Sequence, residues 1–305
     1  MSRGGVTRRI SVIVPCYNAD DTLGVQLAAI AAQEFDGDVE VIVADNGSTD
    51  GSRALAERYR ASIPNLRVID ASHKRGAAHA RNIGAAAATG THLLFCDADD
   101  EMAPGYLQAM SKALERDDFV ACRYEYERLN MSWLALARPA GQSGEPMGGF
   151  CHPTLPYAGG GGLGIRKSAH DAVGGFDTAL RAAAGQEDSD YCIRVQLAGT
   201  PLKYVPAAVM HIRVKTTMRG LFKQAKSWAE SGAYIYQRYQ LADAERPRIS
   251  ATATSLTKHL AWRLLHLRTR ADLAQFIWQA GWSVGWFEAM VRMRGHLRGA
   301  PDARV

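Results

Sequence analysis

Three carboxylates follow a short apolar run near residue 95. The run Leu93-Leu94-Phe95-Cys96 leads directly into Asp97-Ala98-Asp99-Asp100. A continuous apolar run is typical of a strand buried on both faces, and open α/β sheets bind ligands at the carboxyl ends of such strands. Two acidic side chains one residue apart can share a hard divalent cation. A solvated acidic turn that caps the next helix is an equally simple interpretation of these acids alone.

Two further groups of polar residues also follow predicted strands. Asp45-Asn46-Gly47-Ser48-Thr49-Asp50 comes after the strand 39–43, where Asp and Asn could pair with a base edge or a ribose hydroxyl. A plain Asx turn is the simpler alternative. The stretch 73–84, with Arg81 and Asn82, places cations around a helix N-terminus, which is a site that phosphates favour. A solvated basic helix face would produce the same pattern.

The second half of the chain adds three candidates. Glu187 and Asp188 open a predicted helix over 186–198, where acids usually complement the helix dipole but can also act as a general base. His211 interrupts an apolar run, and a lone histidine of this kind is more often hydrogen-bonded than a ligand. Four consecutive glycines, 159–162, either approach a ligand closely or flex.

The elements that would position these residues alternate regularly. Predicted strands cover 10–15, 39–43, 66–69, 93–96 and 119–126, and predicted helices cover 22–31, 52–61, 76–88 and 105–115. This alternation predicts an α/β fold with a doubly wound, mostly parallel sheet and helices on both faces. Loops over the sheet are expected from 126 to 157, a short strand at 163–165, a helix at 167–173 and an extended segment at 202–205. From residue 217 onward helical patterns dominate, which predicts a C-terminal helical extension.

Composition limits the class of protein. The 305 residues carry a net charge of +5, but the segment from Arg213 onward has 16 Lys and Arg against 6 Asp and Glu. A basic end section suggests contact with an anionic surface. The five cysteines form no Cys-x-x-Cys pair, which favours a reducing compartment over a disulfide framework or zinc ribbon. Neither a secretory signal nor a run of 18 apolar residues is present, so we expect a cytoplasmic protein without a spanning helix.

Taken together, the motifs resemble the family 2 inverting glycosyltransferases, which use nucleotide-diphosphate sugars and have the GT-A fold. The resemblance covers residues 10 to about 240, and its strength lies in the order and spacing of several motifs. These are Ser11-Val12-Ile13-Val14-Pro15-Cys16-Tyr17-Asn18, the loop 45–50, Gly76-x-x-x-Ala80-Arg81-Asn82-x-Gly84, Asp97-Ala98-Asp99-Asp100 with Pro104, Gly174-Gly175-Phe176-Asp177 and Glu187-Asp188-x-Asp190. The implied domains are a catalytic GT-A unit over 1–212 and a helical region over 213–305.

The resemblance implies roles for individual residues. The nucleotide would be held by Pro15, Tyr17, Asp45 and Asn46, supported by Arg81 and Asn82. Asp99 would bind Mg²⁺ or Mn²⁺, Asp97 would contact the ribose or the metal, Asp100 would cap the next helix, and His211 would be a further metal ligand. Asp188 would be the general base, with Glu187 as the second candidate, and Gly160, Gly161 and Gly162 would line the acceptor side. Removing a general base typically costs about 10²–10⁴-fold in rate.

Departures from the family pattern refine these expectations. Asn46 stands where many members have a second Asp, so the nucleotide base stays open, although a UDP-sugar is favoured. Gln224-Ala225-Lys226-Ser227-Trp228 lacks the arginine of the processive polysaccharide synthases, which predicts transfer of single sugars. The acceptor would be a carbohydrate or lipid-linked hydroxyl, in assembly of a cell-surface glycan, polysaccharide or glycolipid.

The C-terminal region leaves two interpretations open. Its tryptophans, from Trp262 to Trp286, occur among arginines, which is typical of a segment that lies in a membrane interface. This would attach the protein peripherally to the inner face of the plasma membrane. A helical pair packed on its own core, or on a second subunit in a homo-oligomer, explains the pattern equally well. No nucleic-acid-binding motif accompanies the basic residues.

Two other functions compete with glycosyl transfer. A sugar-phosphate nucleotidyltransferase would have a Gly-rich, basic loop after the first strand, where this chain has Pro15-Cys16-Tyr17-Asn18. A non-catalytic nucleotide-sugar-binding or scaffold protein of the same fold would have no need of the intact Asp97, Asp99 and Asp188.

Overall fold

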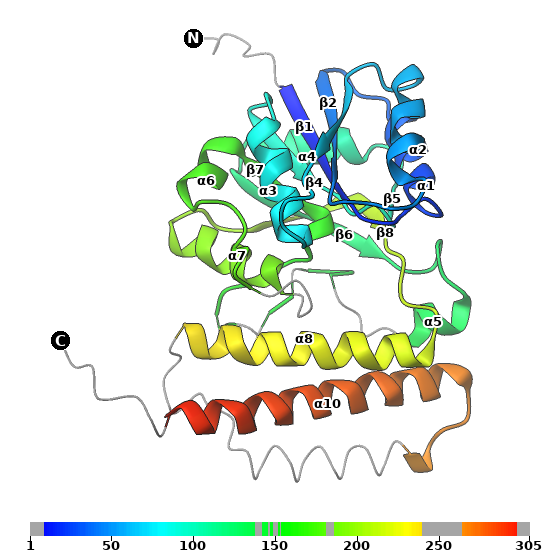
Figure 1. The fold of residues 1–305 in the computed structure, drawn as a ribbon, viewed down its shortest axis with the longest axis vertical. Helices are drawn as coiled ribbons and strands as arrows, with labels where there is room; N and C mark the ends of the chain where they lie inside the picture. The colour runs from blue at the N-terminus through cyan, green and yellow to red at the C-terminus, as the bar shows by residue number, and fades with distance from the viewer. Residues whose placement is uncertain are drawn as a thin grey trace, which may run out of the picture.

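A computed structural model gives the structure of the protein and describes residues 9–137, 142–145, 147–148, 152, 154–180, 186–239 and 264–297. A sheet with helices on both faces forms the upper part of the molecule in Figure 1, and two long helices lie beneath it. The strands are β1 (Arg9–Cys16), β2 (Asp38–Asp45), β3 (Leu66–Asp70), β4 (His92–Phe95), β5 (Glu101–Met102), β6 (Phe119–Glu125), β7 (Leu163–Arg166) and β8 (Lys203–His211).

The helices fall between these strands and after the last one. They are α1 (Leu23–Ala31), α2 (Ser52–Arg58), α3 (Ala77–Ala87), α4 (Tyr106–Leu114), α5 (Ser132–Ala137), α6 (Lys167–Ala172), α7 (Glu187–Leu197), α8 (Met218–Arg238) and α10 (Arg270–Leu297). Two short 3₁₀ helices are η1 (Tyr59–Ala61) and η2 (Gly160–Gly162). The strand and helix alternation expected for the first 115 residues is therefore confirmed.

The eight described strands form one mixed sheet in the order β3-β2-β1-β4-β7-β6-β8-β5. The pairs β1–β2, β1–β4, β2–β3 and β6–β8 are parallel. The pairs β4–β7, β6–β7 and β5–β8 are antiparallel. The predicted α/β fold is confirmed, and its antiparallel pairs all lie beyond β4.

Alternation along the strands divides the core into two layers. Val12 and Val14 of β1 face α1, α2 and α4, whereas Ile13 between them joins the layer of α3 and α7. Because successive side chains of a strand point to opposite faces, a strand covered on both sides must be apolar throughout. This arrangement confirms helices on both faces of the sheet.

β8 is longer than the extended segment expected at 202–205. Its pairing with β6 shifts register between Cys122 and Arg123, which pair with Val205 and Val209. Pro206 lies in the interval skipped by this shift, where a residue without an N–H does not interrupt a ladder. The irregularity lets β8 continue to His211 beside the loop that carries the aspartates.

The expectation of loops alone between 126 and 157 was wrong, because α5 forms there. Leu134 and Ala137 pack with Leu221, Ala225 and Trp278 in a separate apolar core between α5, α8 and α10. An isolated six-residue helix is unstable in water, so this tertiary contact explains α5. The predicted C-terminal helical extension is confirmed, but part of its core comes from residues before the proposed boundary at 212, and that boundary stays a prediction.

The two long helices run in the same direction and approach closely. A Cβ atom on Gly281 would lie 2.5 Å from the carbonyl oxygen of Phe222, and one on Gly285 would lie 2.2 Å from that of Lys226. Both positions therefore require glycine for the backbones to meet. Over the described part of the chain, no helix combines the length and apolar character needed to cross a membrane.

Candidate active site

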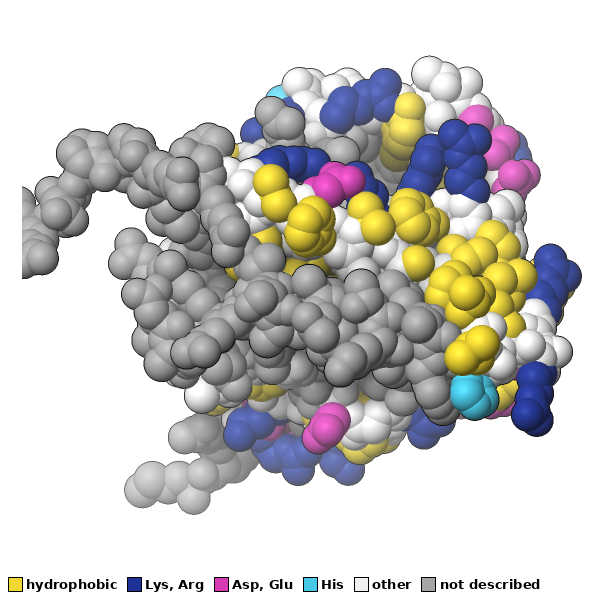
Figure 2. Space-filling model, turned by 90° about the horizontal axis from the view of Figure 1, so that it is seen from below, with side chains coloured by type: hydrophobic (Ala, Val, Ile, Leu, Met, Phe, Trp, Pro, Cys, Tyr) yellow, Lys and Arg dark blue, Asp and Glu magenta, His cyan; other side chains and the backbone are white. Residues whose placement is uncertain are grey.

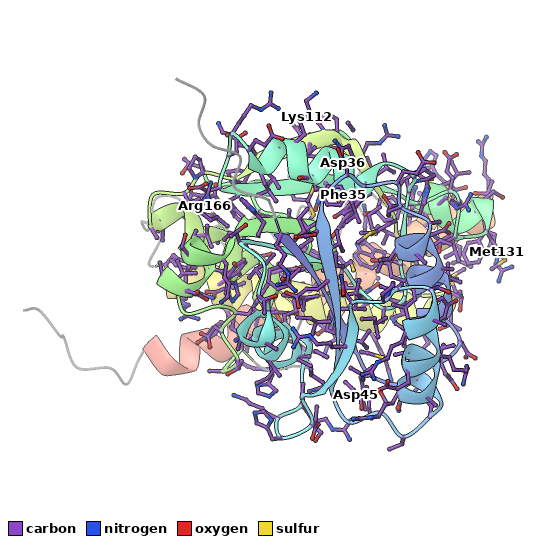
Figure 3. The ribbon with its side chains drawn as sticks, turned by 90° about the horizontal axis from the view of Figure 1, so that it is seen from above. Phe35, Asp36, Asp45, Lys112, Met131 and Arg166 are labelled. Carbon is purple, nitrogen blue, oxygen red and sulfur yellow. The ribbon has the colours of Figure 1, made fainter. Side chains whose placement is uncertain are left out.

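The parallel strands end together at one edge of the sheet. Cys16 of β1 pairs with Asp45 of β2, which in turn pairs with Asp70 of β3. Figure 3 shows Phe35 and Asp36, which precede β2, at one end of that strand and Asp45 at the other. The loops that carry the predicted nucleotide-binding residues all leave the sheet at the edge marked by Asp45.

The loops after β1 and β2 are tied to each other. The side-chain oxygen of Asn18 accepts a hydrogen bond from the backbone N–H of Thr49 at 2.8 Å, and the N–H of Asn18 donates to Ser48 Oγ at 3.1 Å. Asn18 has a φ of 46°, which turns the chain sharply after Tyr17. The Tyr17 ring is 48% exposed and carries the Arg75 guanidinium 4.4 Å from its centroid. An exposed aromatic face beside a cation can stack a nucleotide base.

Asp45 is buried below these loops. Its Oδ1 accepts from the Ser48 N–H at 3.0 Å, and its Oδ2 lies 3.7 Å from Arg53 Nη1. The two contacts hold the loop after β2 and the start of α2 against the end of β2. Pro15 is half-buried at the end of β1, directly before Cys16.

Asn46, the first residue after β2, is buried and its amide is bound within the chain. Its Nδ2 donates to the carbonyl oxygens of Ala71 at 2.5 Å and Lys74 at 2.8 Å, and its Oδ1 accepts from Gly76 N–H at 2.8 Å. These bonds occupy both ends of the buried amide. Asn46 therefore shapes the loop between β3 and α3, and its contact with a nucleotide stays a prediction.

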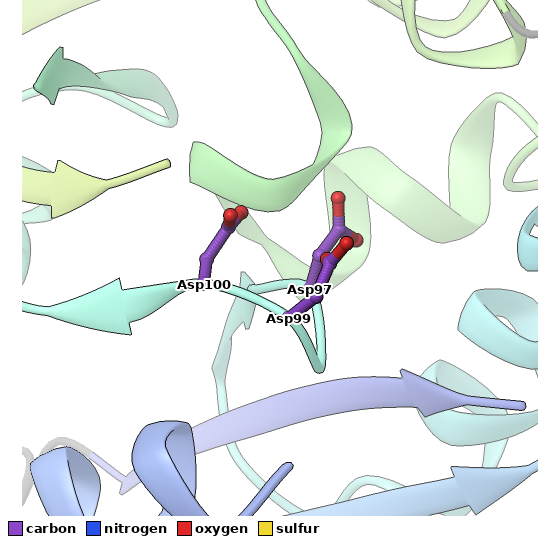
Figure 4. Close-up of side chains that lie close together, drawn as sticks. All are labelled: Asp97, Asp99 and Asp100. Atoms are coloured by element: carbon purple, nitrogen blue, oxygen red, sulfur yellow. The ribbon is translucent and has the colours of Figure 1, made fainter. Parts of the chain in front are cut away.

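The three aspartates after β4 form one cluster. Each of Asp97, Asp99 and Asp100 offers a carboxylate oxygen within 4.8 Å of the other two. Figure 4 shows the three side chains projecting from the same side of their loop. Burial, followed by the charge of Asp97, raises the pKa of Asp99 above its usual value. A hard divalent cation fits this set, because oxygen ligands are the ones it prefers and its charge would relieve the repulsion between the acids.

Asp100 belongs to this cluster and does not cap α4, so the expected capping role was wrong. The residue before α4 is Gly105, in the left-handed region, and the Leu107 N–H in the first turn of that helix donates to Gln33 Oε1 at 3.3 Å. Asp100 Oδ1 instead accepts from the backbone N–H of Arg213 at 2.9 Å. The Arg213 side chain donates from Nε to the carbonyl oxygen of Asp99 at 3.0 Å. Arg213 thus fixes the aspartate loop from the segment that follows β8.

Arg81 lies between the aspartate loop and the start of α7. Its Nη2 contacts Asp97 Oδ1 at 2.7 Å and its Nη1 contacts Glu187 Oε1 at 2.9 Å. Burial alone would lower the pKa of Arg81, but Asp97 and Glu187 raise it above its usual value. This buried guanidinium joins the aspartate loop to the start of α7.

Asp188 points into the same region. Its Oδ2 accepts a hydrogen bond from the backbone N–H of Gly160 at 2.9 Å, and its Oδ1 accepts from the N–H of Ser189 at 2.8 Å. Burial, and then the charge of Glu187, raises the pKa of Asp188 to about 6. A carboxylate with a pKa near neutrality can accept a proton from a hydroxyl group more readily than an ordinary aspartate.

The glycines of η2 lie between Asp188 and the aspartate cluster. A Cβ atom on Gly160 would be 2.8 Å from Arg81 Cζ, and one on Gly161 would be 2.7 Å from Asp97 Oδ2. On Gly162 a Cβ would be 2.4 Å from the sulfur of Cys122. The run of glycines is explained by this contact with the charged centre, which leaves no room for side chains.

Two other predicted residues have different surroundings from those expected. The Asn82 amide donates to the carbonyl oxygen of Phe176 and accepts from its N–H, both at 2.8 Å. It therefore holds the turn after Gly174 and Gly175, and its support of a nucleotide stays a prediction. His211 Nδ1 forms a short hydrogen bond with Glu125 Oε2, and among the described residues the carboxylate cluster does not include this histidine. Its role as a metal ligand stays a prediction.

Residues that the motifs did not indicate also shape the site. Buried Gln26 of α1 donates to the carbonyl oxygen of Asp97 at 3.2 Å and accepts from the N–H of Met102 at 2.9 Å. Gln26 therefore binds the aspartate loop at both of its ends, Asp97 and Met102. Two turns further on, Gln33 donates to the carbonyl oxygen of Ala103 at 3.0 Å. The charge of Lys215 opposes part of the rise in the pKa of Asp99 that burial and Asp97 cause. The seven-residue spacing of the glutamines was a signal, but nothing in the sequence showed what they face.

Comparison with known proteins identifies the N-terminal part of the chain. The model of the family described as glycosyl transferase family 2 matches residues 11–174. The uncharacterized glycosyltransferase YibD of Escherichia coli is 37% identical over 122 residues, which cover 39% of this chain and 35% of YibD. The pre-mycofactocin glycosyltransferase of Mycobacterium tuberculosis is 26% identical over 278 residues, which cover 86% of this chain and 53% of the relative. The first relatives are thus matched over about a third of their length.

Solved structures support the fold over nearly the whole chain. The mannosyltransferase PcManGT of Pyrobaculum calidifontis, in complex with GDP-Man and Mn²⁺, has a TM-score of 0.65 at 20% identity, covering 93% of this chain and 87% of that one. TarS 1-349 of S. aureus, in complex with UDP-GlcNAc, has a TM-score of 0.53 at 15% identity, covering 94% and 92%. At these identities the likeness concerns the fold alone, and it confirms the expected GT-A architecture.

Proposed function

Because the chain belongs to glycosyl transferase family 2, we propose that it transfers a single sugar from a nucleotide-diphosphate sugar to a hydroxyl acceptor with inversion. One observation carries this proposal. The aspartate cluster and Asp188 lie on either side of Gly160 and Gly161, with the Asp188 carboxylate 2.9 Å from the Gly160 nitrogen. A group that stabilises a leaving diphosphate and a group that accepts the acceptor's proton therefore lie close enough to act on one sugar.

The aspartate cluster is proposed to hold Mg²⁺ or Mn²⁺. Asp99 and Asp97 would be the ligands, Asp100 would complete the acidic set, and His211 is kept as a further candidate. When bound, the metal would neutralise the charge that develops on the leaving nucleoside diphosphate. Two cations follow β8, Arg213 and Lys215, and both act on the pKa of Asp99. They would contribute to holding the diphosphate. PcManGT was solved with Mn²⁺, which supports this assignment by analogy.

The nucleotide is proposed to bind at the ends of β1 and β2. Pro15, Tyr17 and Asp45 would contact the base and ribose, with Arg75 beside the Tyr17 ring. Relatives of this fold were solved with GDP-Man, UDP-GlcNAc and UDP. A UDP-sugar remains the favoured donor.

Asp188 is proposed as the general base. Its carboxylate would take the proton of the acceptor hydroxyl as the acceptor oxygen bonds to the anomeric carbon. The bond from that carbon to the diphosphate breaks, and the leaving diphosphate keeps the electron pair. Attack opposite the leaving group inverts the sugar carbon. Glu187 is a weaker candidate for the base, since its Oε1 is already paired with Arg81 at 2.9 Å.

The acceptor would approach over Gly160, Gly161 and Gly162, as a carbohydrate or lipid-linked hydroxyl in cell-surface glycan, polysaccharide or glycolipid assembly.

Attachment to the cytoplasmic face of a membrane is proposed through the exposed apolar side chains of α10. Figure 2 shows hydrophobic side chains gathered on this underside with Lys and Arg nearby. Exposed on the helix are Leu273, Val284, Phe287 and Val291. The tryptophans take a smaller part than expected, because Trp228, Trp278 and Trp282 pack into the core between α5, α8 and α10. A homo-oligomer through the same helices is the alternative.

A screen of UDP-, GDP- and dTDP-sugars with Mn²⁺ or Mg²⁺ tests the function. A donor at 100 times its dissociation constant stabilises the folded state by about 2.7 kcal/mol, which raises the melting temperature by roughly 5–10 °C. We expect one donor to do so, and to be hydrolysed slowly, only with the metal present. Asp99→Ala should lose both effects, whereas Asp118→Ala, which removes a surface ion pair with Arg166, should keep them. The function would be refuted if no donor affected the wild type differently from Asp99→Ala.

A further inference from the structure

Asp190, on α7 two residues after Asp188, has partners on its own helix and at the end of α8. It is 0% exposed. Its Oδ2 contacts Arg194 Nε at 2.7 Å, and its Oδ1 accepts from the Tyr239 hydroxyl at 2.7 Å and lies 3.3 Å from Arg238 Nη1. A buried carboxylate is destabilising unless it is paired and hydrogen-bonded. Two of the three groups that satisfy Asp190 come from the end of α8.

Arg238 also binds the turn that precedes α7. Its Nη1 contacts Asp177 Oδ2 at 2.6 Å. Asp177 follows a backbone segment that Arg194 fixes through the carbonyl oxygens of Val173 and Gly175, at 2.8 and 2.7 Å. One guanidinium therefore joins two carboxylates that lie on either side of the connection between this turn and α7.

The first turn of α7 is held from two sides as well as by its own N-cap residue. Its N-cap residue, Gln186, has a φ of 88°, and its carbonyl oxygen and Oε1 accept from the Asp190 N–H at 3.1 Å and from Ser189 Oγ at 2.6 Å. On the side of the sheet, the turn is held by Arg81 at Glu187 and by the Gly160 N–H at Asp188. On the opposite side the contacts run to Arg238 and Tyr239. The direction in which Asp188 points depends on both sets.

We propose that Arg238 and Tyr239 are positioning residues, which hold the first turn of α7 so that the Asp188 carboxylate faces the acceptor hydroxyl. In this arrangement α8 acts as a brace for the general base and is not merely an appendage. The inference rests on the proposed function of Asp188. A misplacement of about 1 Å in a reacting group can cost about 100-fold in rate, so a brace far from the substrate can control turnover.

Kinetics of Tyr239→Phe, Arg238→Gln and the double variant test the brace. We expect kcat of the double variant to fall tenfold or more, because displacement of the general base slows the transfer step. KM for the donor, and the thermal stabilisation by nucleoside diphosphate with Mn²⁺, should stay within about twofold of wild type, because the donor loops are untouched. Arg238→Lys, which keeps a cation near the two aspartates, should recover part of kcat. Arg292→Gln is the matched control, since Arg292 also contacts two carboxylates, Glu230 and Glu288, but only between α8 and α10.

Hydrogen exchange provides a measurement that does not depend on turnover. The amides of 187–190 should exchange faster in the double variant than in wild type and in Arg292→Gln. Tyr239→Phe removes a single hydroxyl and serves if the double variant does not fold. The proposal is overturned if kcat stays at the wild-type value, even with a lowered melting temperature, or if exchange in α7 is unchanged. A wild type that turns over no sugar nucleotide would refute the proposed function instead, and the exchange experiment would still decide whether the brace exists.

Discussion

Replacing Asp188 with asparagine should abolish most of the transfer activity without weakening the fold. Burial and the neighbouring Glu187 raise the pKa of Asp188 to about 6, from an ordinary value of 3.8. Two pKa units correspond to roughly 3 kcal/mol, which is an upper figure for what the ionised side chain costs the folded state at neutral pH. Asparagine carries no charge, and its single oxygen can still accept the hydrogen bond from the Gly160 N–H, whereas its NH₂ group cannot accept the one from the Ser189 N–H. We therefore expect the free energy of unfolding at pH 8 to rise by roughly 1–3 kcal/mol.

The pH dependence follows from the same shift. Because the folded-state pKa lies above the unfolded-state value, the native protein binds this proton more readily. The wild type loses the corresponding stability as pH rises through about 6. The stability gap between variant and wild type should thus be largest above pH 6 and should disappear below about pH 4.

Activity should change in the opposite direction. Loss of a general base typically lowers the rate by about 10²–10⁴-fold. In the wild type kcat/KM should rise with pH through about 6 and then level off, as the free carboxylate forms. Urea unfolding at several pH values and initial rates across the same range measure both effects. Asp171→Asn is the control, since Asp171 is exposed and forms only an i,i+4 pair with Lys167. Wild-type rates in Asp188→Asn, or a loss of stability greater than 1 kcal/mol at pH 8, would contradict the reasoning.

Three other outcomes follow from the geometry. Gly161→Ala should lower the transfer rate by tenfold or more, about the cost of displacing a reacting group, since its Cβ would meet Asp97 Oδ2 at 2.7 Å. Gly144→Ala should have wild-type initial rates, because a Cβ there meets nothing within 4 Å. Gln26→Leu should lower the free energy of unfolding in urea by about 1–3 kcal/mol, because it leaves the Met102 N–H and the Asp97 carbonyl group unpaired, and Gln33→Leu should cost less. The full-length protein should sediment with anionic liposomes at low salt and not with neutral ones; failure to sediment with either would refute membrane attachment.

Local patterns were sufficient for most of the catalytic fold. Apolar runs such as Leu93 to Cys96 and the helices between them are short-range signals, and the central parallel strands β1, β2 and β4 are largely buried on both faces. The carboxyl ends of parallel strands meet at one edge, so the proximity of the loops after β1, β2 and β4 followed from the order of the elements. Membership of glycosyl transferase family 2, expected from the ordered motifs, is confirmed by the match over residues 11–174.

The sequence was less informative about which atoms each polar residue uses. Asn46 and Asn82 have the residue types of a ligand-binding loop, yet both amides are occupied by backbone groups of this chain. Asp100 resembled a helix cap because it precedes α4, but Gly105 takes the position before that helix. The groups that bind these side chains come from segments distant in the sequence: Ala71 for Asn46, Phe176 for Asn82 and Arg213 for Asp100.

The sequence by itself thus determined the sheet, the position of its ligand-binding edge and the types of charged group available there. Only the tertiary structure decided that Arg81 joins Asp97 to Glu187, that η2 lies between the aspartates and Asp188, and that Arg238 reaches α7. The physical reason is separation along the chain. Secondary structure depends on neighbours a few residues apart, whereas Arg81 and Glu187 are 106 residues apart and Arg238 and Asp177 are 61 apart, so their contacts exist only once the whole chain has packed.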